Sequence, residues 1–123
     1  MKFLTIVIAT AATMLATAAF AQTPRLVTEE MMVPSSDPGI EIYVRNKRPA
    51  DMTAFRPDRT VVYVHGATYP SSTSFDLPVG GISWMDYIAS RGYDVYLLDL
   101  RGYGKSTRPK EMSQPAEAFG RHR

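Results

Sequence analysis

The sequence predicts an α/β fold with a parallel core, and two short apolar stretches carry that prediction. Residues 60–64 and 94–98 are rich in β-branched and aromatic side chains and do not alternate with polar residues. This pattern is typical of strands buried on both faces of a sheet. The segment between them is long enough for a right-handed crossover through one helix. Open α/β sheets place their chemistry at the carboxyl ends of such strands, so we expect a site in the loops that begin at His65 and Asp99.

Length and composition indicate one globular domain and exclude several functions. The chain has 123 residues, of which 45% are hydrophobic and 21% are charged, which are ordinary values for a folded domain. Its net charge is only +2 and it has no long run of Lys or Arg, so nucleic-acid binding has little support. The absence of cysteine excludes disulfides and thiol nucleophiles. The two histidines, His65 and His122, do not form metal-ligand spacing, so we expect no metal and no cofactor.

The first 21 residues are predicted to be a bacterial-type secretory signal peptide. Lys2 supplies a positive charge, an apolar stretch rich in alanine and threonine follows, and AFA at 19–21 forms a cleavage site. A retained membrane anchor is the alternative, because the apolar stretch approaches the length of a bilayer span, but the cleavage site favours removal. The prediction is a periplasmic or secreted protein with no membrane segment after cleavage. Its domain would cover 22–118, with an irregular tail at 119–123.

Two further segments extend the predicted sheet. Residues 26–33 and 40–46 alternate well enough for half-exposed strands, and residues 34–39 between them are dense in Pro, Ser, Asp and Gly. We therefore expect an antiparallel hairpin at the amino terminus. Residues 46–59 contain two prolines and several charges, which indicates a surface loop.

These features resemble one known family. The string VYVHG at 62–66, followed about thirty residues later by YLLDLRGYGKS at 96–106, is similar to the amino-terminal part of the α/β-hydrolase fold. The order and separation of the two motifs make the resemblance specific, and it covers roughly residues 25–115. It implies the first half of an α/β-hydrolase sheet, incomplete, with an amino-terminal hairpin and then a parallel strand–helix–strand unit. It also implies a hydrolase acting by acyl transfer on a small ester-like substrate.

The resemblance implies a role for the turn that follows the first buried strand. In acyl transfer, negative charge develops on the carbonyl oxygen, and fixed backbone N–H groups stabilise it. The family's His-Gly turn supplies such donors, so the N–H of Ala67, with that of Thr68 as a second contributor, is the expected oxyanion hole. Gly66 would let the backbone approach the substrate closely, and His65 would hold the loop rather than carry the catalytic proton. The alternative interpretation is that His65 and Gly66 merely end a strand.

Between the two strands the sequence predicts a long polar loop and one helix. Residues 69–81 are rich in Pro, Ser, Thr and Gly. A loop of this length is often functional and would overhang the site, although a flexible insertion is equally consistent with it. Ser83 and Asp86 form a capping-box pattern at a helix start. The apolar face of this helix is expected from three residues: Trp84, Met85 and Ile88.

The glycine-rich turn at 99–106 is expected to be structural. It ends in GKS like a phosphate-binding P-loop, but that motif requires glycine where Asp99 stands, so nucleotide binding is rejected. Gly102 and Gly104 allow a tight turn, and Asp99 and Arg101 would pin it by hydrogen bonds.

The sequence contains no nucleophile elbow. A serine hydrolase of this fold needs G-x-S-x-G between a strand and a helix, then an acid and a histidine, and no such string occurs. Ser106 has no histidine placed to activate it. We therefore expect a fragment of a secreted hydrolase that is inactive alone. The sequence leaves open whether the full-length parent uses Ser or Asp as its nucleophile. Family members with an Asp nucleophile act on epoxides or haloalkanes.

A second hypothesis is a small non-catalytic exported protein that uses the half-sheet as a binding module. In the family's strand order the strand at 60–64 lies mid-sheet, so in a half-sheet one of its edges would be open. Open apolar edges pair with other strands. We therefore expect self-association through this edge, and poor solubility or partial unfolding of the chain alone.

Overall fold

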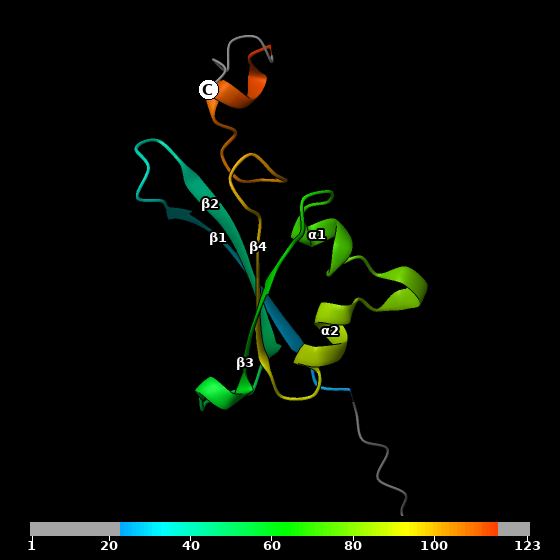
Figure 1. Ribbon diagram of the computed structural model, residues 1–123. Helices are drawn as coiled ribbons and strands as arrows, with labels where there is room; N and C mark the ends of the chain where they lie inside the picture. Colours follow the sequence, from blue (N-terminus) through cyan, green and yellow to red (C-terminus); the bar gives the residue numbers. More distant parts are fainter. Residues whose placement is uncertain (1–22, 116–123) are drawn as a thin grey trace, which may run out of the picture.

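The structure, a computed structural model, describes residues 23–115. A four-stranded sheet in the order β1-β2-β4-β3 forms its centre (Figure 1). The predicted signal peptide at 1–21 and the tail at 119–123 lie outside the described residues. The strands are β1 (Leu26–Pro34), β2 (Glu41–Pro49), β3 (Thr60–Val64) and β4 (Asp94–Leu98). The helices are η1 (Pro57–Arg59), α1 (Ser71–Ser74), η2 (Val79–Gly81), α2 (Trp84–Ala89) and η3 (Lys110–Ser113).

Strand pairing confirms the predicted hairpin and the predicted crossover. β1 and β2 are antiparallel, with Leu26 opposite Pro49 and Pro34 opposite Glu41. β3 and β4 are parallel and are joined through α1, η2 and α2. β4 also pairs antiparallel with β2, so it is the central strand that joins the hairpin to the crossover. Nowhere in residues 23–115 is a helix long and apolar enough to cross a membrane.

β2 is longer than predicted. It continues to Pro49, so the prediction of a surface loop beginning at residue 46 is wrong for residues 46–49. Asn46 is buried and donates from Nδ2 to Asp94 Oδ1 at 2.6 Å and to the carbonyl oxygen of Val95 at 3.1 Å. The buried polar side chain of Asn46 thus has hydrogen-bond partners on β4. Such tertiary contacts let a polar segment form a strand.

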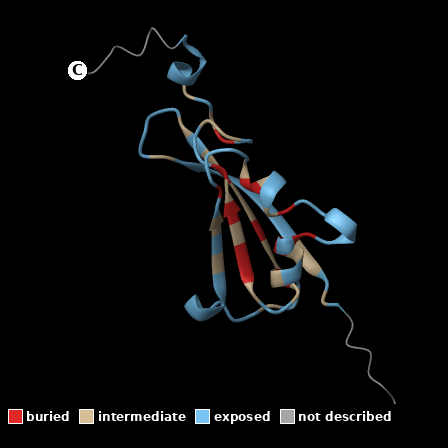
Figure 2. Ribbon diagram, turned by 45° about the vertical axis from the view of Figure 1, so that its right-hand side comes forward, coloured by how far each residue is buried: buried red, intermediate tan, exposed pale blue. Residues whose placement is uncertain are grey.

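β3 differs from the prediction in its burial. Val62 and Val64 are 59% and 49% exposed, and only the alternate residues Val61 and Tyr63 pack against the core. Within the described residues β3 lies at the edge of the sheet, paired with β4 alone, and Figure 2 shows it mostly exposed beside the buried β4. The prediction of burial on both faces is therefore wrong for β3, and the predicted open edge is present in this part of the chain.

The core lies between the sheet and the two α-helices, which sit on the same side of it (Figure 1). The capping box of α2 is confirmed: Ser83 Oγ accepts from the Asp86 N–H at 2.9 Å, and Asp86 Oδ2 accepts from the Ser83 N–H at 3.0 Å. Trp84 was expected to face the core, and this is wrong, because its side chain is 67% exposed. The buried core residues are Tyr43, Met85, Ala89, Val95 and Leu97.

The segment at 69–81 is more ordered than a simple loop. It contains α1 and η2, so the prediction of a long loop without helices is wrong in part. Ser71, the first residue of α1, is fully buried and donates from Oγ to the carbonyl oxygen of Leu98 at 2.5 Å. Phe75 stacks on Tyr63 of β3, with ring centroids 4.2 Å apart. The start of this segment is therefore fastened to both parallel strands.

Candidate functional site

His65 holds the turn after β3 through both of its ring nitrogens. Nε2 accepts the N–H of Leu100 at 2.9 Å, so that nitrogen carries no proton. Nδ1 lies 2.5 Å from the carbonyl oxygen of Gly66 and is therefore the protonated nitrogen that donates to it. The ring is buried and lies against Tyr103, with ring centroids 4.7 Å apart. Both nitrogens contact backbone atoms only, which leaves neither of them free to activate a nucleophile.

Ala67 and Thr68, the expected oxyanion donors, lie in the turn after β3. Both residues are exposed, and neither N–H donates a hydrogen bond to any residue that the structure describes. The carbonyl oxygen of Ala67 accepts a hydrogen bond from the Tyr103 hydroxyl at 2.7 Å, which fixes the turn from the opposite side. Gly66 has no positive φ, and a Cβ added to it would meet nothing within 4 Å. The space beside Gly66 is therefore open, as an approaching ligand requires.

Asp99 connects three segments from a fully buried position. Its Oδ1 accepts the N–H of Ser71 at 2.8 Å, and its Oδ2 accepts the N–H of Lys105 at 3.1 Å. Its own N–H donates to the carbonyl oxygen of Tyr43 at 3.0 Å, which extends the contact between β4 and β2. Gly104 approaches this carboxylate so closely that an added Cβ would lie 2.0 Å from Oδ2. The carboxylate is committed to structure, because backbone donors occupy both oxygens.

Ser106 and Arg101 have structural contacts as well. The buried Ser106 hydroxyl donates to the carbonyl oxygen of Asp99 at 2.5 Å and accepts the N–H of Tyr43 at 2.8 Å. Arg101 was expected to pin its own turn, and this is wrong: its guanidinium pairs with Asp37 in the turn between β1 and β2. The part of the chain that the structure describes therefore contains no serine hydroxyl bonded to a histidine ring, since His65 is its sole histidine.

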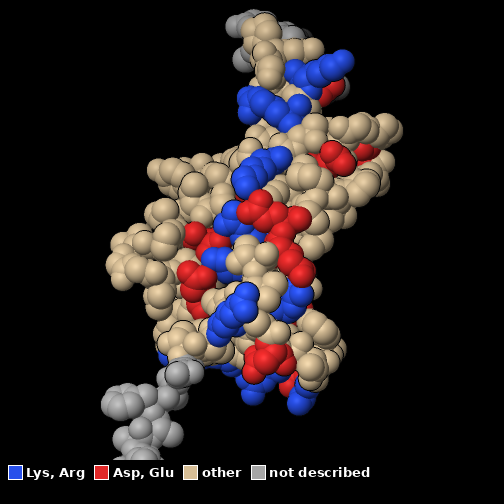
Figure 3. All heavy atoms as spheres, turned by 180° about the vertical axis from the view of Figure 1, so that it is seen from behind, with Lys and Arg blue, Asp and Glu red and all other residues tan. Residues whose placement is uncertain are grey.

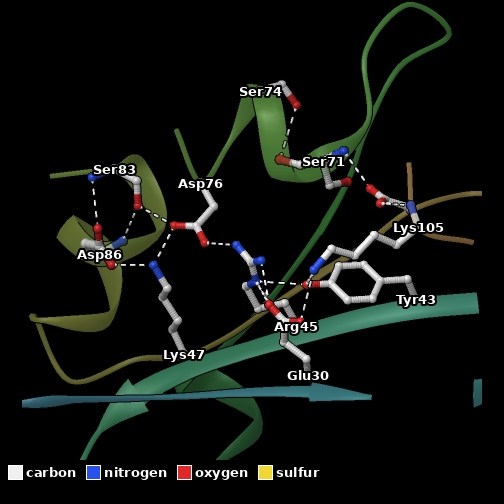
Figure 4. A network of polar contacts seen from close by, with 11 residues as sticks. Glu30, Tyr43, Arg45, Lys47, Ser71, Ser74, Asp76, Ser83, Asp86 and Lys105 are labelled. Atoms are coloured by element: carbon white, nitrogen blue, oxygen red, sulfur yellow. Dashed lines mark hydrogen bonds and ion pairs between the residues drawn. The ribbon is translucent and has the colours of Figure 1, made fainter. Parts of the chain in front are cut away.

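A network of charged groups ties the segment at 69–81 to β2 (Figure 4). Asp76 has a side chain that is only 2% exposed, and its two oxygens lie 2.6 Å from Arg45 Nη1 and 2.6 Å from Lys47 Nζ. The Ser83 hydroxyl donates to Asp76 Oδ1, also at 2.6 Å. Lys47 continues the network to Asp86, whose pKa is lowered: burial raises it, but hydrogen bonds from Lys47 and Ser83 outweigh that effect.

The outer end of the network is Glu30 on β1. Hydrogen bonds from Lys105, Tyr43 and Arg45 lower its pKa from 4.5 to about 2. Arg45 has a raised pKa, because hydrogen bonds to Asp76 and Glu30 outweigh the lowering by burial. Figure 3 shows acidic and basic groups interspersed on this side of the molecule rather than separated into patches. On this face, acidic and basic side chains of the network therefore lie next to groups of opposite charge.

Lowering the pH should reduce the free energy of unfolding through protonation of Glu30. Because its pKa is lowered on folding, its contribution to stability is present above pH 4.5 and is lost as the pH falls towards about 2. The side chain is 43% exposed, so solvent screening limits the contribution to less than about 1 kcal/mol. The free energy of unfolding in urea should be measured against pH for the unaltered chain and for Glu30→Gln. The two curves should converge at the acid end of this range. A gap between them that stays constant with pH would contradict the assignment.

Two contributors to the site were missed from sequence. Tyr103 was considered only as part of a tight turn, yet its hydroxyl holds the Ala67 carbonyl. Asp76 was passed over, although it is the single charged residue between 69 and 81. A lone acid in such a segment, together with Arg45 and Lys47 on the same side of β2, is a signal that could have indicated the network.

In residues 23–115, no group of three or more metal-binding side chains occurs.

The sheet order, the crossover and the His-Gly turn define an α/β-hydrolase type of fold. A family model for the alpha/beta hydrolase fold matches residues 59–120, about half of the chain. The chain belongs to the α/β-hydrolase fold family. No curated protein matches it. Among solved structures, a thioesterase domain from the curacin biosynthetic pathway is similar, with 20% identity and a TM-score of 0.48. The match covers 68% of this chain and 25% of the thioesterase domain, so the chain spans about a quarter of that structure.

Proposed function

We propose that this chain supplies the oxyanion-binding part of a hydrolase that acts by acyl transfer on small ester-like substrates. The observation that carries the proposal is that the N–H groups of the exposed residues Ala67 and Thr68 have no hydrogen-bond partner among the described residues. Their loop is held from behind by His65 and Tyr103, so the donors need no reorganisation when charge develops on a carbonyl oxygen. Losing one such donor costs about 10²–10³ in rate in an assembled hydrolase.

The same proposal includes inactivity of this chain by itself. The sequence contains no G-x-S-x-G string, His65 is bonded to backbone at both nitrogens, and the Ser106 hydroxyl is bonded to Asp99 and Tyr43. The predicted signal peptide at 1–21 adds the proposal that the protein is secreted or periplasmic, and its AFA cleavage site supports this.

We expect the purified chain to hydrolyse p-nitrophenyl butyrate no faster than buffer. Amide NMR provides the positive test: titration with butyrate, whose carboxylate mimics an oxyanion, should shift the amide protons of Ala67 and Thr68 downfield. The amide protons of the exposed turn glycines Gly39 and Gly80 serve as controls, and their chemical shifts should not change. Ala67→Pro removes the central N–H and should abolish the shift at Thr68 while the dispersed spectrum of a folded chain is retained.

Two results would contradict the proposal in different ways. Equal shifts at Ala67, Thr68 and the control glycines would remove the oxyanion assignment. Turnover that Ala67→Pro abolishes without unfolding the chain would instead show that the chain contains its own nucleophile.

The open edge of β3 supports a second candidate function, a self-associating module. The edge strand has no charged residue between 60 and 64 to discourage pairing. We expect Val62→Lys to weaken self-association at least about tenfold, since an edge lysine blocks strand pairing, as measured by sedimentation velocity. Phe55→Lys adds the same charge at a residue of matched exposure, 60% against 59% for Val62, and should have little effect. A wild-type chain that sediments as a monomer at all concentrations would exclude this function.

A further inference from the structure

A cavity lies among the helical segments that connect β3 to β4. It is formed between α1, η2 and α2, has a volume of about 430 Å³ and is open to solvent. Its apolar lining comes from Leu77, Val79, Ile82, Trp84 and Tyr87, all of which are among the exposed large hydrophobic residues of the molecule. Figure 1 shows this segment projecting from the sheet. Five large apolar side chains exposed within eleven residues are more than scattered surface hydrophobes, and such a patch marks an interaction site.

The walls of the cavity are held in place by ion pairs and hydrogen bonds of the surrounding segment. Asp76, which lies between the lining residues Ser74 and Leu77, is fixed to Arg45 and Lys47 of β2, and the capping box between Ser83 and Asp86 fixes the start of α2. Asp86 also pairs with Lys47, so the segment is tied to β2 at both Asp76 and Asp86. The cavity is therefore preformed, which lowers the entropic cost of binding a ligand.

No charged side chain lines the cavity. The hydroxyls of Thr73 and Ser74 donate to the carbonyl oxygen of Pro70, and that of Ser83 donates to Asp76. The nearby guanidinium of Arg91 lies on the ring of Tyr87 and donates to the Tyr87 carbonyl oxygen. An ionised ligand would therefore find no counter-charge in the lining to offset the part of its hydration that it loses on binding.

Two polar groups of the lining stay available. Neither the indole N–H of Trp84 nor the hydroxyl of Tyr87 hydrogen-bonds to another residue within the described part of the chain. The two rings lie edge to face, with centroids 5.8 Å apart. An aromatic pair with unused donors suits a flat, uncharged ligand that carries a hydrogen-bond acceptor.

We propose that this cavity is a binding site for a neutral aromatic small molecule with one carbonyl or ether oxygen. Its volume falls within the range of small-molecule pockets in proteins. The site is separate from the turn at Ala67 and Thr68, none of whose residues line it. It therefore stands whether or not the oxyanion assignment holds.

Trp84 is the single tryptophan of the whole chain, so intrinsic tryptophan fluorescence reports on this cavity alone. The probes are methyl benzoate, which is neutral, and benzoate, which has the same ring and a negative charge. Titration of the full chain with methyl benzoate should change the emission saturably, with at least about tenfold weaker binding of benzoate. Ile82→Asp places a carboxylate in the lining at a residue that is 59% exposed and should weaken methyl benzoate binding at least about tenfold.

Phe55→Asp is the matched control, because Phe55 is apolar, 60% exposed and outside the lining. It should bind methyl benzoate like the unaltered chain, and circular dichroism should show that both variants are folded. The proposal is overturned if no saturable change occurs, if benzoate binds equally well, or if the two variants behave alike. It is also overturned if Trp84 emission depends on protein concentration rather than on ligand, because a second copy of the chain would then cover the patch.

Discussion

Replacing Asp99 by alanine is expected to destabilise the chain by about 2–4 kcal/mol, because one buried and one partly buried backbone donor lose their acceptor, and a fully buried donor left unpaired costs about 1–3 kcal/mol. The donors are the N–H groups of Ser71 and Lys105. Without the carboxylate, the start of α1 would keep only the bond from the Ser71 hydroxyl to the Leu98 carbonyl oxygen as its hydrogen bond to the end of β4. The measurement is the free energy of unfolding in urea, made in the Val62→Lys background so that association at β3 does not interfere.

Two variants control this experiment. Asp58→Ala removes an exposed carboxylate whose partner is the exposed Arg56, and it should change stability by no more than about 0.5 kcal/mol. Asp99→Asn retains one acceptor oxygen and should be intermediate. If Asp99→Ala were as stable as Asp58→Ala, the carboxylate would not be the anchor that its hydrogen bonds indicate.

The second large effect is expected at Asp76. Breaking a buried ion pair by removing one partner usually costs 3–5 kcal/mol, and here we expect about 2–3 kcal/mol for Asp76→Ala, because both cations keep another acid. Arg45 retains Glu30, and Lys47 retains Asp86. The variant should also release residues 69–81 from β2, and limited proteolysis should then cut within this segment faster than in the unaltered chain.

Glu29→Ala is the matched control for Asp76→Ala. Glu29 also pairs with an arginine of β2, Arg48, but its side chain is 49% exposed, so the loss of stability should be much smaller than for Asp76→Ala. Similar losses for the two variants would show that burial of Asp76 adds nothing. Unchanged proteolysis of Asp76→Ala would show that the segment is held by the stacking of Phe75 on Tyr63 instead.

The parallel strands could be predicted from sequence because their signal is local. β3 and β4 begin and end at the predicted residues. A short apolar, β-branched run and the turn residues beside it are contained in a few consecutive positions, so the sequence pattern alone indicates such a strand. The capping box of α2 was equally local, with Ser83 and Asp86 three residues apart. Family resemblance added the expected role of Ala67 and Thr68, which no local pattern could have supplied.

What the sequence could not show depends on partners far along the chain. Asn46 belongs to a strand because Asp94 and Val95 satisfy its side chain, and no periodicity reveals this. Trp84 is the first residue of α2, where its side chain turns away from the sheet, and Met85 and Ala89 fill the core one turn apart. The apolar pattern of a helix of six residues is too short to determine which face is buried.

The hydrogen bonds that cross between the turns after β3 and β4 affect how the molecule moves. His65 Nε2 accepts the Leu100 N–H, the Tyr103 hydroxyl donates to the Ala67 carbonyl oxygen, and Asp99 Oδ1 accepts the Ser71 N–H. Each bond joins one turn to the other, so neither turn can open without releasing donors or acceptors of its neighbour. The two therefore fluctuate as one cooperative unit. The rigidity of the Ala67 and Thr68 amides is set by a segment more than thirty residues farther along the chain.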